Sequence, residues 1–334
     1  MAKAATGRDW AWSALDLHPR PQGERRGLSV KPGFRVLAIV TAICAYAQIA
    51  LGGVVRTSGS GLGCRDQWPL CNGHPYPGWN VHAIIEYSHR TFGAVTAILM
   101  LATFVAAVVL YRRGRPLLAW LSGGALAAVS LEIPLGALVV FRDLAGLLVV
   151  AHLMVAMLTL GLLLATAVAA SAQGWLRRRA GTGFLLATAL LAYFTLLTGA
   201  GVVATGADNQ CHAWPLCGSG LIPDFSGVNA FTMIHRLTVA GLIGLAAWTA
   251  WRHRREPDRT LAGWSTATVA VILIQAAIGI GAAFAVRPTL FDSLHVALAA
   301  AAWGTAATAF LLALDPGRTQ RGGDIRSSPP FSLH

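Results

Sequence analysis

Long apolar stretches separated by short polar segments form the main pattern of this chain. Eight such stretches recur, near residues 34–55, 88–111, 117–140, 146–170, 183–205, 229–251, 263–286 and 291–314. About 20 helical residues, each rising about 1.5 Å, cover the roughly 30 Å hydrocarbon core of a bilayer. The pattern therefore predicts an all-α polytopic membrane protein with eight transmembrane helices. A composition of 55% apolar and 12% charged residues agrees with this class.

Positive charges gather at one end of the predicted helices. Of the 26 Lys and Arg residues, 20 lie in the N-terminal arm, the C-terminal tail and the loops after the second, fourth and sixth helices. Such asymmetry is typical of cytoplasmic segments, so we expect a multi-pass protein of the cell membrane with both termini cytoplasmic. The net charge of +12 follows the membrane pattern, so we expect lipid around the protein and no nucleic-acid partner. Residues 1–33 lack the apolar core of a cleaved signal peptide.

Two blocks of the chain are alike. One block recurs 146 positions later: Trp68-Pro69-Leu70-Cys71 as Trp214-Pro215-Leu216-Cys217, and His89-Arg90 as His235-Arg236. We predict a duplication, in which residues 34–175 and 176–315 each form a four-helix bundle between a cytoplasmic arm (1–33) and tail (316–334). Because each half has an even number of helices, both halves share one orientation, and a pseudo-two-fold axis along the membrane normal should relate them.

Each even-numbered helix carries one histidine within about 10 Å of the outer surface. These are His89, His152, His235 and His295. One interfacial histidine is commonly a plain polar side chain, but four at matching depth indicate a function. Two imidazoles that face each other across a four-helix bundle can ligate one heme iron axially. Zinc fits less well, because the cysteines are better placed to pair with each other, and a dicopper site would not explain one histidine per helix.

Other polar residues accompany these histidines. Glu86 precedes His89 by three positions and shares its helix face; it is either a functional acid or a carboxylate favoured by the helix dipole. The matching position in the second half is Thr232, so only one half has the acid. Arg90 and Arg236 can pair with anionic heme propionates or extend to the membrane interface.

A polar pair also lies deeper in the bundles. Glu132 in the third helix is matched 143 positions later by Gln275 in the seventh. The pair either orients a neighbouring ligand or only joins helices, and the sequence favours neither role.

Two cysteine pairs lie in the outer loops. Cys64 and Cys71 follow a glycine-rich segment that predicts a loop, and Cys211 and Cys217 occupy the matching loop. The oxidising outer side permits a disulfide in each. Such a bridge can be a simple staple, shape a lid over a buried site, or take part in thiol redox chemistry. Cys44, alone in the first helix, is expected to be a small apolar residue, and His74 and His82 are expected to be solvated.

Together these residues resemble the heme A synthase family of membrane heme O oxidases. The resemblance rests on Gly59-Ser60-Gly61-Leu62-Gly63-Cys64, the two Trp-Pro-Leu-Cys segments, Glu86-x-x-His89-Arg90, His152, Cys211, His235-Arg236 and His295, and covers essentially residues 34–314. It implies that His235 and His295, with Arg236, hold a heme b cofactor (iron protoporphyrin IX). It further implies that His89 and His152, with Arg90, receive the substrate heme O, and that Glu86 is catalytic.

The reaction implied by this resemblance is oxidation of a ring methyl group of heme O to a formyl group by successive hydroxylations, which gives heme A for cytochrome oxidase. The implied partners are heme O synthase and the cytochrome oxidase assembly machinery. A di-heme membrane electron carrier of the cytochrome b type is an alternative, and a transporter or membrane thiol oxidoreductase is a third. Glu86 favours the enzyme, since a pure carrier needs no acid in one half only.

Overall fold

The computed structural model describes residues 29–172, 181–211, 214–217, 222–255, 258–284 and 288–314. The N-terminal arm as far as residue 28, the tail 316–334 and the arginines at 177–179 lie outside these residues. The helices are α1 (Pro32–Thr57), α2 (Val81–Tyr111), α3 (Pro116–Phe141), α4 (Gly146–Ser171), α5 (Thr182–Ala204), η2 (Ala207–Asn209), α6 (Asn229–His253), α7 (Arg259–Phe284) and α8 (Pro288–Ala313). All eight long helices are apolar enough to cross a membrane. The all-α prediction with eight spans is therefore confirmed for the described chain, in which no strand occurs.

The start of α2 is the largest difference from the predicted boundaries. Hydropathy placed it near residue 88, whereas the helix begins at Val81. The side chain of Asn80 caps it by accepting hydrogen bonds from the backbone amides of His82 and Ala83, at 2.9 and 3.1 Å. The first turns are too polar to register as an apolar stretch. Glu86 consequently lies inside a regular helix and not at its end.

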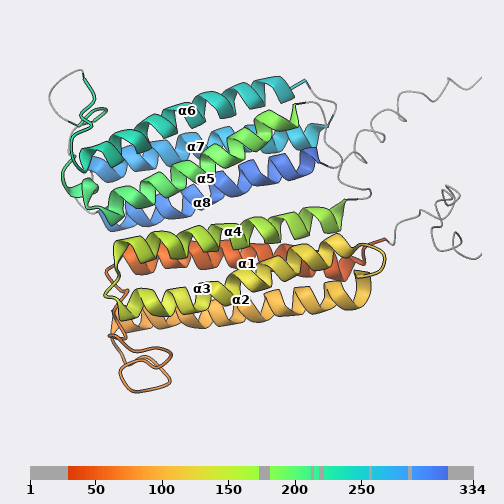
Figure 1. Cartoon of the computed structure of the whole chain (residues 1–334), viewed down its shortest axis with the longest axis horizontal. Coiled ribbons are helices and arrows are strands. Elements are labelled where there is room, and N and C mark those ends of the chain that lie inside the picture. Colours follow the sequence, from red (N-terminus) through yellow and green to blue (C-terminus); the bar gives the residue numbers. More distant parts are fainter. Residues whose placement is uncertain are drawn as a thin grey trace, which may run out of the picture.

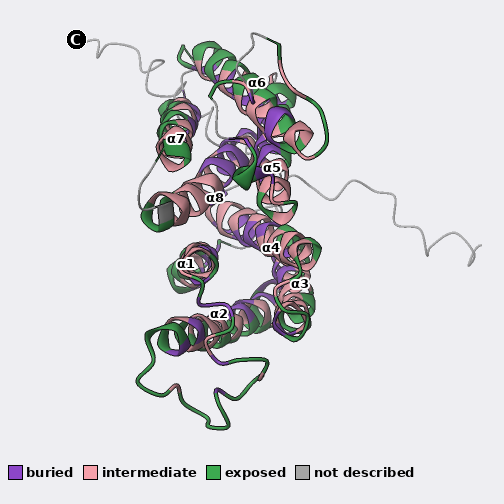
Figure 2. Cartoon of the chain, turned by 90° about the vertical axis from the view of Figure 1, so that its left-hand side faces the viewer, coloured by how far each residue is buried: buried purple, intermediate pink, exposed green. Residues whose placement is uncertain are grey.

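The helices of each half pack in a closed ring. In the first half α1 contacts α2 and α4, and α3 contacts the same two helices; α5 to α8 repeat this arrangement. Figure 1 shows the two sets of helices one above the other, and Figure 2 shows them end on. Because α2 and α4 lie at opposite corners of one ring, and α6 and α8 at opposite corners of the other, their side chains can face each other across the ring interior.

The two rings meet along α1, α4, α5 and α8. The hydroxyl of Tyr46 on α1 donates to the carbonyl of Ala297 on α8, at 3.3 Å. In the opposite sense, the hydroxyl of Tyr193 on α5 donates to the carbonyl of Met154 on α4, at 3.0 Å. These reciprocal contacts are those that a two-fold relation between the halves requires. The axis itself stays a prediction.

Close helix contact at this interface depends on a small residue. A Cβ at Gly161 of α4 would lie 2.5 Å from the ring of Trp303 on α8. Trp303 is buried and packs against Tyr193, with ring centroids 5.8 Å apart. Small residues at helix interfaces let membrane helices approach closely, which increases dispersion contact where no hydrophobic effect drives association.

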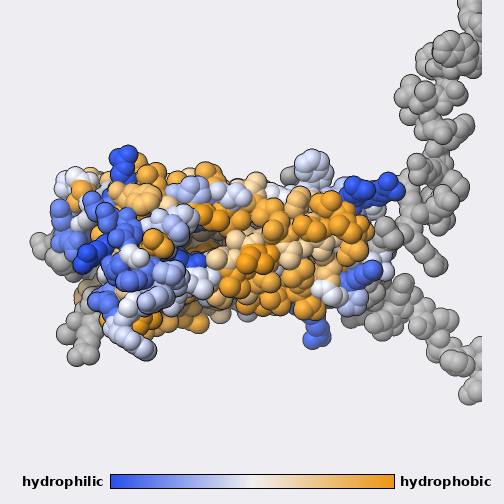
Figure 3. Space-filling view, turned by 90° about the horizontal axis from the view of Figure 1, so that it is seen from below, coloured by the Kyte–Doolittle hydropathy of each residue, from blue (hydrophilic) through white to orange (hydrophobic). Residues whose placement is uncertain are grey.

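The outer surface fits a bilayer. Large apolar side chains are exposed on outward faces, for example Ile43, Ile98, Val109 and Trp120. Figure 3 shows a hydrophobic band along the helices, with hydrophilic residues concentrated at one end and smaller groups of them at the other. Exposed apolar area of this extent suits contact with lipid.

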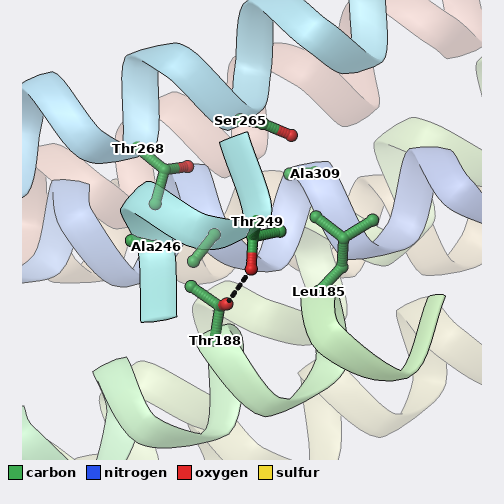
Figure 4. A pocket seen from close by; sticks show the side chains of 8 residues that line it. Leu185, Thr188, Ala246, Thr249, Ser265, Thr268 and Ala309 are labelled. Atoms are coloured by element: carbon green, nitrogen blue, oxygen red, sulfur yellow. Dashed lines mark hydrogen bonds between the residues drawn. The ribbon is translucent and has the colours of Figure 1, made fainter. Parts of the chain in front are cut away.

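The second ring contains a small cavity between α5, α6, α7 and α8 (Figure 4). Its volume is only about 10 Å³, and it is lined by Leu185, Thr188, Ala246, Thr249, Ser265, Thr268, Ala306 and Ala309. The hydroxyls of Thr188 and Thr249 lie 3.2 Å apart across it, and Thr41 and Thr103 make the corresponding contact between α1 and α2 at 3.0 Å. These hydroxyl contacts join neighbouring helices inside the membrane.

We expect Gly161→Ala to destabilise the contact between the rings, because its methyl group has no space beside the rigid ring of Trp303. Gly241→Ala is the matched control, since no atom lies within 4 Å of its added Cβ. The difference in unfolding free energy between the two variants should be about 1 to 3 kcal/mol, the usual cost of overpacking. Thermal unfolding of the purified variants in detergent measures it. Equal stability would contradict the close contact.

Candidate functional site

The four histidines lie in the first turns of the four even-numbered helices. His89 of α2 lies near His152 of α4 in the first ring, and His235 of α6 lies near His295 of α8 in the second. All four side chains are half-buried. The fold thus brings together the two pairs that the sequence predicted as facing imidazoles.

Each imidazole lies directly against a glycine of a neighbouring odd-numbered helix. A Cβ on that glycine would approach the Cε1 atom of the ring: 3.0 Å for Gly52 and His89, 3.1 Å for Gly136 and His152, 2.9 Å for Gly199 and His235, and 2.6 Å for Gly279 and His295. Any larger residue would push the ring toward the centre of its bundle. We call these four residues the histidine-facing glycines. These glycines leave room for each imidazole at the wall of its four-helix ring.

A polar residue precedes each histidine-facing glycine by one helical turn: Gln48, Glu132, Thr195 and Gln275. The clearest contact is at His235, whose Nδ1 donates to the carbonyl of Thr195 at 3.1 Å. The Nδ1 of His152 lies 3.1 Å from Oε1 of Glu132. Nδ1 of His152 nevertheless has no hydrogen-bond partner among the described residues, so both roles foreseen for Glu132, orienting a ligand and joining helices, stay open.

The donor set suits an iron porphyrin better than a compact metal site. Among the described residues, no three His, Cys, Asp or Glu side chains come together as potential metal ligands, so a tetrahedral zinc set does not form there. What each ring offers is two imidazoles on helices at opposite corners. Axial ligation of one heme iron requires that arrangement, and the histidine-facing glycines give the imidazoles the space to adopt it.

Glu86 is held tightly beside the first pair. Its side chain is buried, with 3% of the residue exposed. Oε2 accepts a hydrogen bond from the backbone amide of Cys64 at 2.8 Å, and Oε1 pairs with the guanidinium of Arg90. A buried carboxylate is tolerated where donors and an opposite charge compensate for lost water. Nη1 of Arg90 also donates to the carbonyl of Leu70, at 3.2 Å, so this arginine ties the acid to the loop between α1 and α2. We keep the name outer loop for this segment and its counterpart between α5 and α6, after their predicted orientation.

The second ring lacks this charged group. Thr232 occupies the position that matches Glu86, and its Oγ1 is buried with no hydrogen-bond partner among the described residues. Arg236 nevertheless keeps the loop contact, since its Nη1 donates to the carbonyl of Pro215 at 2.9 Å. Both arginines therefore hold outer loops. Their predicted pairing with propionates stays a prediction.

Both predicted disulfides are present, Cys64–Cys71 and Cys211–Cys217. The first is fully buried against Ala83, and the second is nearly so. Burial favours a structural role, because thiol–disulfide exchange requires access to a sulfur atom. Cys44 is a free thiol, as predicted.

The outer loop of the first half rests on the first turn of α2. A Cβ at Gly63 would lie 2.3 Å from the carbonyl carbon of His82. His82, predicted to be a solvated loop residue, is exposed but lies in the first turn of α2 and not in the loop. Its Nδ1 lies 3.0 Å from Oγ of Ser60, so it contributes to this contact. The loop therefore brings the amide of Cys64 to Glu86 through backbone packing.

Two rings of apolar helices, each with a pair of imidazoles toward one end, define a multi-pass membrane protein whose residues can accommodate a heme iron near one surface. The chain matches the COX15-CtaA family model, described as cytochrome oxidase assembly protein, over residues 35–82 and 78–307, and belongs to that family.

Relatives of similar sequence carry the name heme A synthase. The protein of Symbiobacterium thermophilum is 31% identical over 301 residues, which cover 85% of this chain and 96% of the relative. That of Bacillus pumilus is 29% identical over 267 residues, 75% of this chain and 85% of the relative. That of Exiguobacterium sibiricum is 30% identical over 241 residues, which cover 68% of this chain and 79% of the relative. The family resemblance seen in the sequence is thereby confirmed.

Sequence reasoning gave no role to the histidine-facing glycines, nor to Gln48 and Thr195. A signal for them exists, because a polar residue followed four positions later by glycine occurs at matching places in all four odd-numbered helices. Single occurrences are common in membrane helices, where glycine is frequent. Only comparison of all four with the histidine positions would have singled them out.

We expect Gly63→Ala to lift the outer loop from α2, because its methyl group would overlap backbone atoms of His82. The buried Cys64–Cys71 bridge should then become accessible and be reduced by a water-soluble phosphine at least about tenfold faster. Gly78→Ala in the same loop has no atom within 4 Å of its Cβ and serves as control. Mass-tagging of the released thiols gives the rate, and equal rates would contradict the proposed loop contact.

Proposed function

We propose that this protein is a heme A synthase, which oxidises a ring methyl group of heme O to a formyl group and so supplies heme A for cytochrome oxidase. One observation carries the proposal beyond family membership. Of two closely matched histidine sites, only the first has a buried carboxylate, Glu86, where the second has Thr232. A site that changes its ligand needs such a group, and a site that only carries electrons does not.

We assign the two halves accordingly. Residues 34–175, with His89, His152 and Arg90, receive the substrate heme O. Residues 176–315, with the histidines and arginine at the matching positions, hold heme b as cofactor. The fit of an iron porphyrin to both halves is supported by the opposed imidazoles and by the room that the histidine-facing glycines leave for them.

A heme iron, when bound, supplies the redox chemistry. The protein's own contribution is placement and proton transfer. Two successive hydroxylations of a methyl group give a carbon with two hydroxyls, which loses water to become a formyl group. Glu86 shares a helix face with His89 and is fixed by the amide of Cys64 and the guanidinium of Arg90. Its carboxylate oxygen can accept a hydroxyl proton as the formyl group forms.

We further propose that the histidine end of the bundles faces the outside of the cell. Arg112, Arg113, Arg252 and Arg254 lie at the ends of α2 and α6 that are farthest from the histidines. Positive residues favour the cytoplasmic side, and disulfides favour the outer one. We also propose that heme O synthase supplies the substrate heme O. The cytochrome oxidase assembly machinery would receive the product heme A.

A di-heme electron carrier is the second candidate, because matched imidazole pairs by themselves would serve electron transfer. Glu86 separates the two functions. We expect Glu86→Ala to retain bound heme but to lower heme A formation at least about 100-fold, the usual contribution of a positioned acid or base. Thr232→Ala, at the matching place in the other half, should remain active. Pyridine hemochrome spectra of the purified variants, with heme O supplied, measure both heme content and product; undiminished heme A formation by Glu86→Ala would favour the carrier.

The assignment of halves can be tested through the histidine-facing glycines. Gly199→Leu should displace His235 and lower the heme b content of the purified protein about tenfold or more, while leaving heme O uptake in place. Gly52→Leu should displace His89 and lower heme O uptake about tenfold or more, while leaving the heme b content in place. Extraction and chromatography of the bound hemes distinguish the two outcomes. Loss of the same heme in both variants would refute the assignment.

A further inference from the structure

The two histidines that follow the disulfide loops have different hydrogen-bond partners. The Nδ1 of His235 lies 3.1 Å from the carbonyl oxygen of Thr195 and 3.2 Å from Oγ1 of Thr198. A carbonyl oxygen only accepts, so Nδ1 carries the proton. The lone pair of Nε2 is then free for iron at all times. His235 is therefore prepared as a ligand before any heme arrives.

His89 meets an amide group instead. Nε2 of Gln48 lies 3.0 Å from the carbonyl oxygen of His89, which requires the NH₂ end of the amide to point there. The same NH₂ group lies 3.1 Å from Nδ1 and 3.3 Å from Nε2 of the imidazole. An imidazole that accepts this donor at Nδ1 carries its proton on Nε2, and one that accepts it at Nε2 has that lone pair occupied. In either case Nε2 is unavailable to iron until Gln48 moves.

The other end of the amide has no partner. Oε1 of Gln48 is buried and accepts no hydrogen bond from the described residues. A buried acceptor without a donor is costly, so it favours a state in which a donor reaches it. The Nδ1–H of an imidazole bound to iron through Nε2 would be that donor, because the amide already lies beside Nδ1.

The space around Gln48 is specific to this half. A Cβ at Gly93, one turn after His89 on α2, would lie 2.9 Å from Nε2 of Gln48. The matching residues of the second half are Thr195, 147 positions after Gln48, and Val239, 146 positions after Gly93. The long amide and the glycine that accommodates it therefore occur together in the first ring, and a short side chain with a valine occurs in the second.

We propose that Gln48 is a positioning residue that makes His89 a reversible iron ligand. Without heme O, the amide donates to the imidazole; when iron takes Nε2, the ring proton resides on Nδ1 and the amide turns so that Oε1 accepts it. His235, with its fixed carbonyl acceptor, keeps its heme. This inference rests on the proposed function, because it gives the substrate half an exchangeable iron bond and the cofactor half a permanent one.

Three variants of the full-length protein test the role of the amide, with heme O as the probe. Gln48→Glu provides a stronger acceptor for Nδ1–H, so the midpoint potential of the added heme should fall and its release should slow about tenfold or more. Gln48→Met removes the acceptor, so the potential should rise and release should accelerate. Gly93→Ala crowds the unaltered amide and should act like Gln48→Met. Redox titration and heme transfer to apomyoglobin provide both readouts.

Thr195→Val is the matched control in the second ring. It leaves the backbone carbonyl that holds His235, so the potential and retention of both hemes should stay unchanged. If Gln48 only fills space, the two Gln48 variants should not shift the midpoint potential of the added heme in opposite directions. The absence of opposite shifts for Gln48→Glu and Gln48→Met would therefore overturn the proposal. If the unmodified protein takes up no heme O, the proposed function fails and this inference with it. If the protein takes up heme O but the Gln48 variants leave its midpoint potential unchanged, this inference is refuted while the proposed function stands.

Discussion

The close contact between an imidazole and a glycine on the neighbouring helix is the constraint on which the site depends. Ring interiors inside a membrane offer no water, so each histidine needs a partner and space supplied by the protein. Glycine supplies the space for all four. A group one turn earlier on the same odd-numbered helix supplies a hydrogen-bond partner for two of them, Gln48 for His89 and the carbonyl of Thr195 for His235. Because α2 lies opposite α4 and α6 opposite α8, the arrangement places the two imidazoles of each half on opposite helices of one ring.

Matched positions in the two halves divide into those that agree and those that differ. The agreeing ones are structural, such as Tyr46 and Tyr193, which bind reciprocally across the interface between the rings. Two of the differing ones adjoin His89: the buried acid Glu86 on its own helix and the amide of Gln48 on α1. A third, Glu132 in place of Gln275, lies beside His152. A duplicated scaffold can thus keep one site for a permanent cofactor while the other acquires groups suited to a ligand that must be bound, altered and released.

The outer loop of the first half belongs to the site as much as the helices do. Its buried disulfide places the backbone amide of Cys64 on Glu86, and Arg90 connects the same carboxylate to the carbonyl of Leu70. The carboxylate is compensated on both oxygens, which explains how an acid can be almost fully buried at this depth. The sequence suggested heme propionates as partners for Arg90; the structure shows that the arginine also fixes the acid.

The sequence by itself determined the eight spans, the four histidines at matching depth, the cysteine pairs and the single acid. Bilayer thickness dictates apolar length, and ionisable residues stand out against an apolar background. It did not determine where α2 begins, because the polar first turns capped by Asn80 escape hydropathy. Nor did it reveal that Gln48 binds His89 or that Cys64 holds Glu86. Those contacts join residues on different elements, and only the packing and rotation of the helices in the tertiary structure decide which side chains meet.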